Sequence, residues 1–92
     1  MIIKLNEDIL DFTGEDSIRY ISNHTSDKIL KIPEFESEIY DLIISLDSPK
    51  KENLIESLSD KYAFKGTSIE DFIDKFLNIL KDNNIINFVS ES

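Results

Sequence analysis

The sequence contains no cysteine and a single histidine, and these two absences exclude several kinds of chemistry. Without thiols the chain forms no disulfide, no thiolate metal site and no cysteine nucleophile. His24 stands beside Asn23 and Thr25-Ser26, a composition typical of a polar turn, so we interpret it as a solvated loop residue. One such histidine assembles neither a histidine metal site nor a Ser-His-Asp triad. We therefore expect no enzyme activity, no metal and no cofactor.

Glycine and proline are also scarce, with two of each among 92 residues, so few positions interrupt regular structure. This length suits one core, and we expect a single domain over residues 1–92. A hydrophobic fraction of 40% with 32% charged residues is typical of a folded chain. The sequence has no Gly-rich phosphate loop, no membrane-spanning apolar run and no signal-peptide pattern at its start. The expected location is the cytoplasm.

Basic residues are outnumbered by acidic ones, ten against nineteen, which gives a net charge of −9. Nucleic-acid affinity comes largely from Lys and Arg releasing counterions, so this balance argues against a nucleic-acid partner. The acids gather in residues 33–49, which hold five acidic residues and no basic one. Such a segment is usually a solvated helix face, although it can also meet a basic partner.

Alternating apolar residues in the first third of the chain predict extended structure. In the last such segment, Leu30 and Ile32 share one face while Ile29 and Lys31 share the other. Gly14-Glu15-Asp16 suits a hairpin connection. Three strands are predicted: Ile9–Thr13, Ser17–Ser22 and Asp27–Ile32. Two further short segments are candidates for an edge strand and a closing strand, respectively: Met1–Leu5 and Ile85–Val89.

Helical spacing replaces the alternation after Ile32-Pro33 and predicts three helices within residues 33–84. Asp47-Ser48-Pro49 ends the first helix and opens the second, Thr67 or Ser68 caps the third, and Asn83-Asn84 suits a left-handed C-terminal cap. The apolar stripes are Phe35, Ile39, Leu42, Ile43 and Leu46; Leu54, Ile55, Leu58 and Tyr62; and Ile69, Phe72, Ile73, Phe76, Leu77, Ile79 and Leu80.

Strands followed by helices indicate an α+β domain, with the helices on one face of a small antiparallel sheet. Its third strand would leave one edge of backbone groups unpaired, and a peptide can add there as a further strand. The last helix has an unusually wide stripe, in which Phe72, Phe76 and Ile79 form a separate sub-face. Periodicity alone leaves open whether this sub-face belongs to the core or lines a ligand groove.

Three stretches of the sequence carry a family resemblance: Ile32-Pro33-Glu34-Phe35-Glu36-Ser37-Glu38-Ile39-Tyr40-Asp41-Leu42-Ile43, then Leu54-Ile55-x-x-Leu58-x-x-x-Tyr62, then Phe72-x-x-x-Phe76-Leu77-x-x-Leu80 followed by Asn84-Ile85-Ile86. In order and spacing they resemble the PqqD-like family, the RiPP recognition elements that bind leader peptides of ribosomally made, modified peptides. The sequence departs from the family pattern at Pro33, Tyr40, Lys51 and Asn84, where Asn or Ser, Trp, an aliphatic residue and Gly are common.

The resemblance implies a winged helix-turn-helix-like fold, a three-stranded antiparallel sheet followed by three helices. It implies that the domain binds the leader of a precursor peptide by strand addition and presents it to a maturation enzyme, such as a radical SAM protein or a leader protease, during PQQ-like, lasso or related biosynthesis. No membrane partner is implied. Backbone groups of the strand, aromatic side chains and lysines would contact the leader: Lys28, Ile29, Leu30, Lys31, Phe72, Lys75, Phe76 and Ile79.

Two other readings of the sequence stay open. Asp47-Ser48 before an apolar helix resembles the phosphopantetheine site of acyl or peptidyl carrier proteins, although we interpret Ser48 as a plain helix cap. Three helices with a small sheet also suit an acidic winged-helix regulator. Its recognition helix would carry Glu70, Asp71 and Asp74, an unfavourable balance for a DNA major groove.

Overall fold

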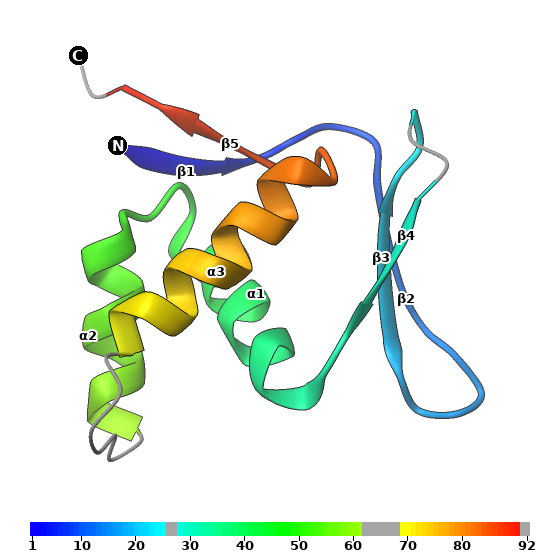
Figure 1. Ribbon diagram of the computed structural model, residues 1–92, viewed down its shortest axis with the longest axis horizontal. Helices are drawn as coiled ribbons and strands as arrows, with labels where there is room; N and C mark the ends of the chain where they lie inside the picture. The colour runs from blue at the N-terminus through cyan, green and yellow to red at the C-terminus, as the bar shows by residue number, and fades with distance from the viewer. Residues whose placement is uncertain (26–27, 62–68, 91–92) are drawn as a thin grey trace.

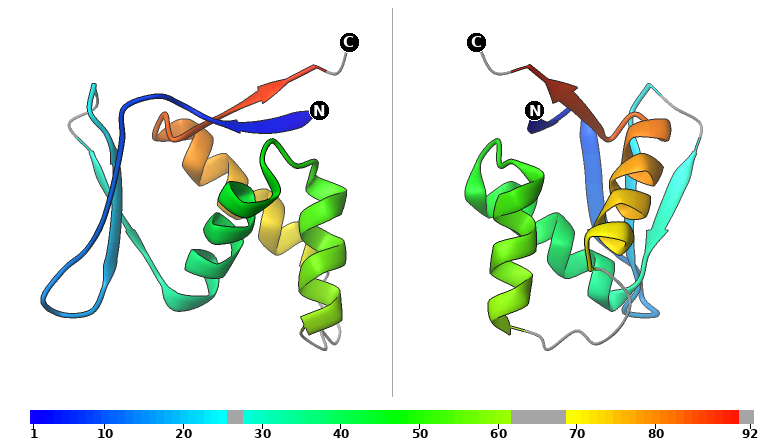
Figure 2. Two further views of the ribbon diagram at one scale, coloured as in Figure 1. Left: turned by 180° about the vertical axis from the view of Figure 1, so that it is seen from behind. Right: turned by 60° about the vertical axis from the view of Figure 1, so that its left-hand side comes forward.

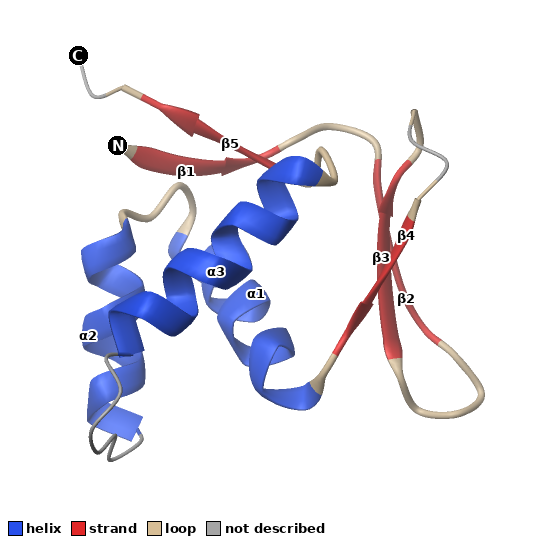
Figure 3. Cartoon of the chain, viewed as in Figure 1, coloured by secondary structure: helices blue, strands red, loops and turns tan. Residues whose placement is uncertain are grey.

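The computed structural model describes residues 1–25, 28–61 and 69–90 of the chain. Three strands of an antiparallel sheet are followed by three helices, as predicted, and one further strand lies at each end of this series (Figures 1 and 3). The fold class is therefore α+β. The elements are β1 (Ile2–Leu5), β2 (Ile9–Thr13), β3 (Arg19–Asn23), β4 (Ile29–Ile32), α1 (Glu34–Leu46), α2 (Lys51–Lys61), α3 (Ile69–Asp82) and β5 (Ile86–Val89).

The three-stranded sheet is a meander in the order β2-β3-β4, with β3 in the centre. Ile21 of β3 stands opposite Asp11 of β2 and Leu30 of β4, and its side chain is fully buried. β3 begins two residues later than predicted because Ser17 adopts a left-handed conformation (φ 65°) in the hairpin turn. β4 begins at Ile29, and Asp27 of the predicted strand lies outside the described residues.

The first strand does not extend this sheet as the sequence reading proposed. β1 pairs antiparallel with β5 in a separate two-stranded sheet, in which Ile2 stands opposite Val89 (Figure 1). The turn that makes this possible is the predicted left-handed cap at Asn84, where φ is 61°. The carbonyl oxygen of Asn84 accepts hydrogen bonds from the side chains of Asn6 (2.7 Å) and Asn23 (2.6 Å). Asn84 therefore joins α3 to β3 and to the segment after β1.

The helix boundaries follow from local backbone chemistry. α1 starts directly after Pro33, which is extended (φ −64°, ψ 164°), and it ends where Asp47 and Ser48 both take positive φ. The interpretation of Ser48 as a helix cap is wrong, because α2 begins only at Lys51. The Lys50 N–H instead donates to Asn53 Oδ1 (2.9 Å) at this helix start. Tyr62, Thr67 and Ser68, expected in α2 and as the cap of α3, lie outside the described residues.

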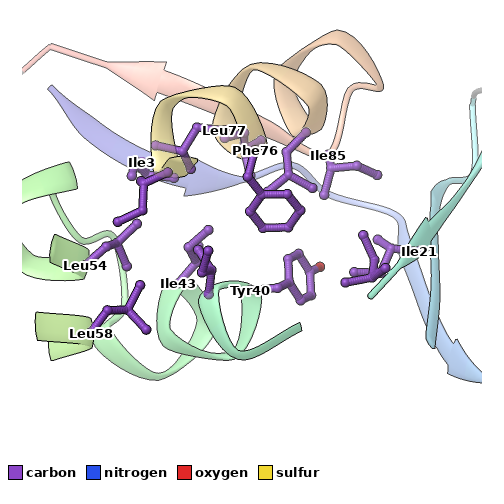
Figure 4. Close-up of a cluster of buried hydrophobic side chains, with 14 residues drawn as sticks. Ile3, Ile21, Tyr40, Ile43, Leu54, Leu58, Phe76, Leu77 and Ile85 are labelled. Atoms are coloured by element: carbon purple, nitrogen blue, oxygen red, sulfur yellow. The ribbon is translucent and has the colours of Figure 1, made fainter. Parts of the chain in front are cut away.

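One continuous core lies between the helices, the β1–β5 pair and the inner face of the three-stranded sheet (Figures 2 and 4). Phe76 of α3 and Tyr40 of α1 point toward one another at its centre. Tyr40 belongs to this core although it stood outside the predicted stripe, whereas the stripe residue Leu46 is 41% exposed. The buried apolar residues are Ile3, Ile21, Ile32, Ile39, Tyr40, Ile43, Leu54, Leu58, Ile73, Phe76, Leu77, Leu80, Ile85 and Ile86.

Candidate functional site

Strand β4 and helix α3 run side by side (Figure 2, right). Residues of both elements line a recess. Its volume is about 370 Å³, and most of its lining is apolar. We call this recess the β4–α3 groove. Its lining residues are Leu30, Lys31, Ile32, Pro33, Glu36, Phe72, Lys75, Phe76 and Ile79.

Strand β4 forms the sheet side of the groove and is an edge strand. Within the described parts of the chain it pairs with β3 alone. The predicted faces are confirmed, since Ile29 (64% exposed) and Lys31 face solvent, whereas Leu30 is half-buried and Ile32 is buried. In an antiparallel ladder, alternate residues of an edge strand direct their N–H and C=O groups away from the neighbouring strand. β4 therefore offers main-chain donors and acceptors beside an apolar recess.

Helix α3 forms the opposite wall. Phe72 (37% exposed) and Ile79 (45% exposed) leave apolar surface uncovered at the groove. Phe76 was predicted to share this sub-face, but it is only 4% exposed and belongs to the core, so its ring forms the groove floor. Phe72 packs edge-to-face on Phe35 of α1 with ring centroids 5.1 Å apart. This contact fixes the Phe72 ring at the end of the groove nearest α1.

The structure brings together most of the residues selected from the sequence. Leu30, Lys31, Phe72, Lys75, Phe76 and Ile79 all line the groove. Lys28 and Ile29 are not among the lining residues of the groove. Lys28 directly precedes β4, and Ile29 is the first residue of that strand. The sequence reading missed Ile32, Pro33 and Glu36 as lining residues. These three residues lie where β4 ends and α1 begins, so this junction forms part of the groove lining.

A second recess, of about 900 Å³, lies between the β2–β3 hairpin and α1. Its centre is Arg19, whose Nε donates to Asp11 Oδ1 (2.8 Å) and whose Nη1 donates to Ser37 Oγ (2.7 Å) and Asp41 Oδ1 (2.7 Å). The guanidinium also lies over the Tyr40 ring, 4.9 Å from its centroid. The hydrogen bond that Arg19 donates to Asp11 is the main cause that raises the pKa of Arg19. This network holds the hairpin against α1.

A third recess, of about 420 Å³, lies on the other flank of α3, between α2, β1 and β5. Its lysine is Lys51, whose Nζ lies 3.0 Å from Glu70 Oε1 and 3.1 Å from Asp74 Oδ1. The hydrogen bonds that Lys51 donates to these two carboxylates raise its pKa, with Glu70 the larger cause. The ion pairs link the start of α2 to α3, so the lysine of this recess is already paired within the fold.

Comparisons of the chain with protein-family models, with curated proteins and with solved structures gave no match. Within the described residues, no three acidic or histidine side chains are grouped so as to hold a metal ion. In the same residues, no helix is both long and apolar enough to span a membrane. The assignment of a function therefore rests on the residues and on the geometry of the groove.

Proposed function

We propose that this domain binds an extended peptide, which adds as a strand to β4 and packs its side chains against α3. The observation that carries this proposal is the β4–α3 groove itself. An edge strand that pairs on one side only, among the residues that the structure describes, and a helix with exposed Phe72 and Ile79 line the same recess. In strand addition, main-chain hydrogen bonds supply affinity, and pockets for alternate side chains supply specificity.

The size and lining of the groove suit this mode of binding. A recess of about 370 Å³ is at the lower end of the range for small-molecule sites. It accommodates the inward-facing side chains of a short strand, which project on one side at every second residue. The floor is Phe76, a buried core residue, so the base of the groove is rigid and the bound peptide meets a preformed surface.

The kind of peptide is suggested by the sequence. The PqqD-like resemblance supports the leader segment of a ribosomally made precursor as the natural ligand. On this proposal the domain holds the leader and presents the precursor to a modifying enzyme or a leader protease, and it performs no bond-making step itself. The maturation enzyme, such as a radical SAM protein, supplies the chemistry.

Calorimetric titration of the chain with leader peptides encoded beside its gene tests this proposal. We expect saturable binding together with slowed hydrogen exchange of the β4 backbone amides, because added strand pairing protects edge N–H groups. Absence of binding at high micromolar concentration for every encoded leader contradicts the leader assignment. Binding without protection of β4 contradicts strand addition.

A matched pair of variants separates a groove effect from a general loss of apolar surface. Ile79→Ser removes an apolar side chain that is 45% exposed at the groove, and Ile44→Ser removes one that is 46% exposed on α1, outside the groove lining. Both substitutions are expected to change the free energy of unfolding by less than about 1 kcal/mol, because neither side chain is buried. Peptide affinity should fall in Ile79→Ser alone.

A further inference from the structure

The charges of the β4–α3 groove run against the charge of the whole chain. Its charged lining residues are Lys31, Lys75 and Glu36, two cations and one anion, in a protein of net charge −9. Lys31 lies on the outer face of β4 and Lys75 on the α3 wall, so the two cations flank the added-strand position from two sides, while Glu36 lines the recess with Lys75. Electrostatic complementarity favours an occupant that places a carboxylate beside Lys31 or Lys75 and disfavours one that places an ammonium or guanidinium group there.

The two groove lysines also differ from cations that the fold uses for itself. Arg19 is held by two carboxylates, whereas Lys31 and Lys75 form no ion pair within the parts of the chain that the structure describes. The pKa of Asp16 is lowered chiefly by the Ile18 N–H, and Lys31 adds only a small through-space contribution. Both lysine residues are exposed, so a ligand in the groove or along β4 can reach them.

The positions of the lysines relative to β4 define which side chains of a bound strand they meet. Lys31 stands opposite Tyr20 on the outer face of the sheet, while its neighbours Leu30 and Ile32 face inward. Lys75 lies on the α3 wall. A strand added to β4 alternates its faces in step with β4. Its inward side chains enter the groove, and the side chain between them lies beside Lys31.

We infer that the peptide bound along β4 carries an alternating apolar–acidic–apolar pattern. The two apolar side chains enter the groove, and the carboxylate between them pairs with Lys31 on the outer face. Lys75, on the groove rim, binds a second carboxylate that lies beyond the apolar pair. This inference rests on the proposed function, because it requires strand addition to β4. Opposite charges on adjacent strands contribute up to about fivefold in affinity.

Three synthetic peptides of roughly eight residues, long enough to extend beyond β4 on both sides, test the pattern. They share flanks and two apolar residues and differ only in the residue between these, which is Glu, Gln or Lys. Fluorescence anisotropy with the full chain should give the tightest binding for Glu, weaker binding by about threefold for Gln, and the weakest for Lys. In Lys31→Gln the preference for Glu over Gln should vanish, while the affinity of the Gln peptide stays unchanged.

Lys4→Gln is the matched control, because Lys4 is exposed on β1, where it stands opposite Asn87, and its loss changes the net charge by the same amount. This variant should keep the preference for Glu. Equal affinity of the Glu and Gln peptides, or a preference that survives Lys31→Gln or is lost equally in Lys4→Gln, overturns the charge pattern and leaves strand addition standing. If none of the three peptides binds while an encoded leader binds and protects the β4 amides, the alternating pattern is wrong and strand addition stands; if neither kind of peptide binds, both proposals fall.

Discussion

The two flanks of helix α3 face recesses of similar size, yet they are built differently. On the flank toward α2, the recess of about 420 Å³ contains Lys51, which is bound by Glu70 and Asp74 of α3. On the flank toward β4, the groove of about 370 Å³ contains Lys75, and no ion pair to this lysine occurs among the described residues. The lysine on the α2 flank is thus neutralised by carboxylates of the same fold, and, among the described residues, the lysine on the β4 flank is not.

This difference separates contacts that hold the fold from the surface that the proposed peptide would cover. A lysine bound by two carboxylates gains little from a further anion, since the added anion must displace existing partners. An unpaired lysine beside half-exposed apolar side chains offers both charge and apolar area. The two recesses are similar in size, so the pairing of their lysines, and not their volume, is the feature on which the proposal of a peptide site in the groove rests.

The largest effect is expected at Phe76, which does not fit the division into fold contacts and groove surface. Its side chain belongs both to the core and to the groove. Phe76→Ala should lower the free energy of unfolding by about 4 kcal/mol and should also weaken peptide binding, since the groove floor is lost. Urea denaturation followed by peptide titration measures both. Phe76→Leu retains most of the buried volume and keeps the fold for the binding assay. Undiminished affinity in both variants contradicts the role of Phe76 in the groove.

A slightly smaller loss of stability is expected on the α2 flank, without an effect on binding. Leu77 is buried and lines the recess near α2, β1 and β5. Leu77→Ala should lower the free energy of unfolding by about 3 kcal/mol, because it leaves a cavity in the core. At denaturant-free conditions the folded protein should bind the peptide as the unchanged chain does. If Leu77→Ala weakens peptide binding by more than the fraction of unfolded protein accounts for, the two flanks of α3 belong to one site.

A substitution of Phe72 should affect peptide binding more than stability, which is the opposite of the result expected for Leu77→Ala. Its ring is more than one third exposed and makes an edge-to-face contact with Phe35. Phe72→Ala should therefore lower the free energy of unfolding by only about 1 kcal/mol. Peptide affinity should fall at least about tenfold, because an aromatic anchor of the groove is removed. Titration calorimetry beside a thermal melt gives both quantities, and a stability loss as large as that of Leu77→Ala would place Phe72 in the core.

The smallest effect concerns the ion pairs of Lys51. These pairs are partly exposed, so Lys51→Met should lower the free energy of unfolding by about 0.5 kcal/mol. Because the pKa of Lys51 is raised above its ordinary value of 10.5, this stabilisation is complete below that pH and is lost as pH rises through the pKa of the folded state. Denaturation at neutral and strongly alkaline pH should show the difference between the two chains disappear. If the two chains still differ in free energy of unfolding at alkaline pH, the contribution of Lys51 comes from packing of its aliphatic stem and not from its ion pairs.

The sequence predicted the parts of this fold that depend on local chemistry. The Ile32-Pro33 switch, the left-handed cap at Asn84 and the faces of β4 follow from backbone preferences and two-residue alternation. The groove was also partly predictable, because an edge strand and an over-wide helix stripe were both visible. Phe76 was predicted to share a sub-face with Phe72 and Ile79, but it is buried in the core. Helical spacing does not distinguish a residue at the floor of a groove from one on its wall.

Contacts between distant residues were not predictable in this way. Arg19 has no periodic signal, and its partner Asp41 lies 22 residues away on a different element. The pairing of β1 with β5 joins the two ends of the described chain, and a short apolar segment contains no information about its partner strand. The ion pairs of Lys51 likewise connect two helices, so only the packed structure shows that one α3 flank is neutralised.

The β1–β5 pairing also has a consequence for the order of events during synthesis. Ile2 pairs with Val89, so β1 cannot form its sheet until β5 has been synthesised. This pairing closes a loop that spans nearly the whole chain, and closing so long a loop is slow compared with forming local structure. β4 and α3 both precede β5 in the chain. As the polypeptide leaves the ribosome, every segment of the groove has been made before the strand that fastens the two ends together.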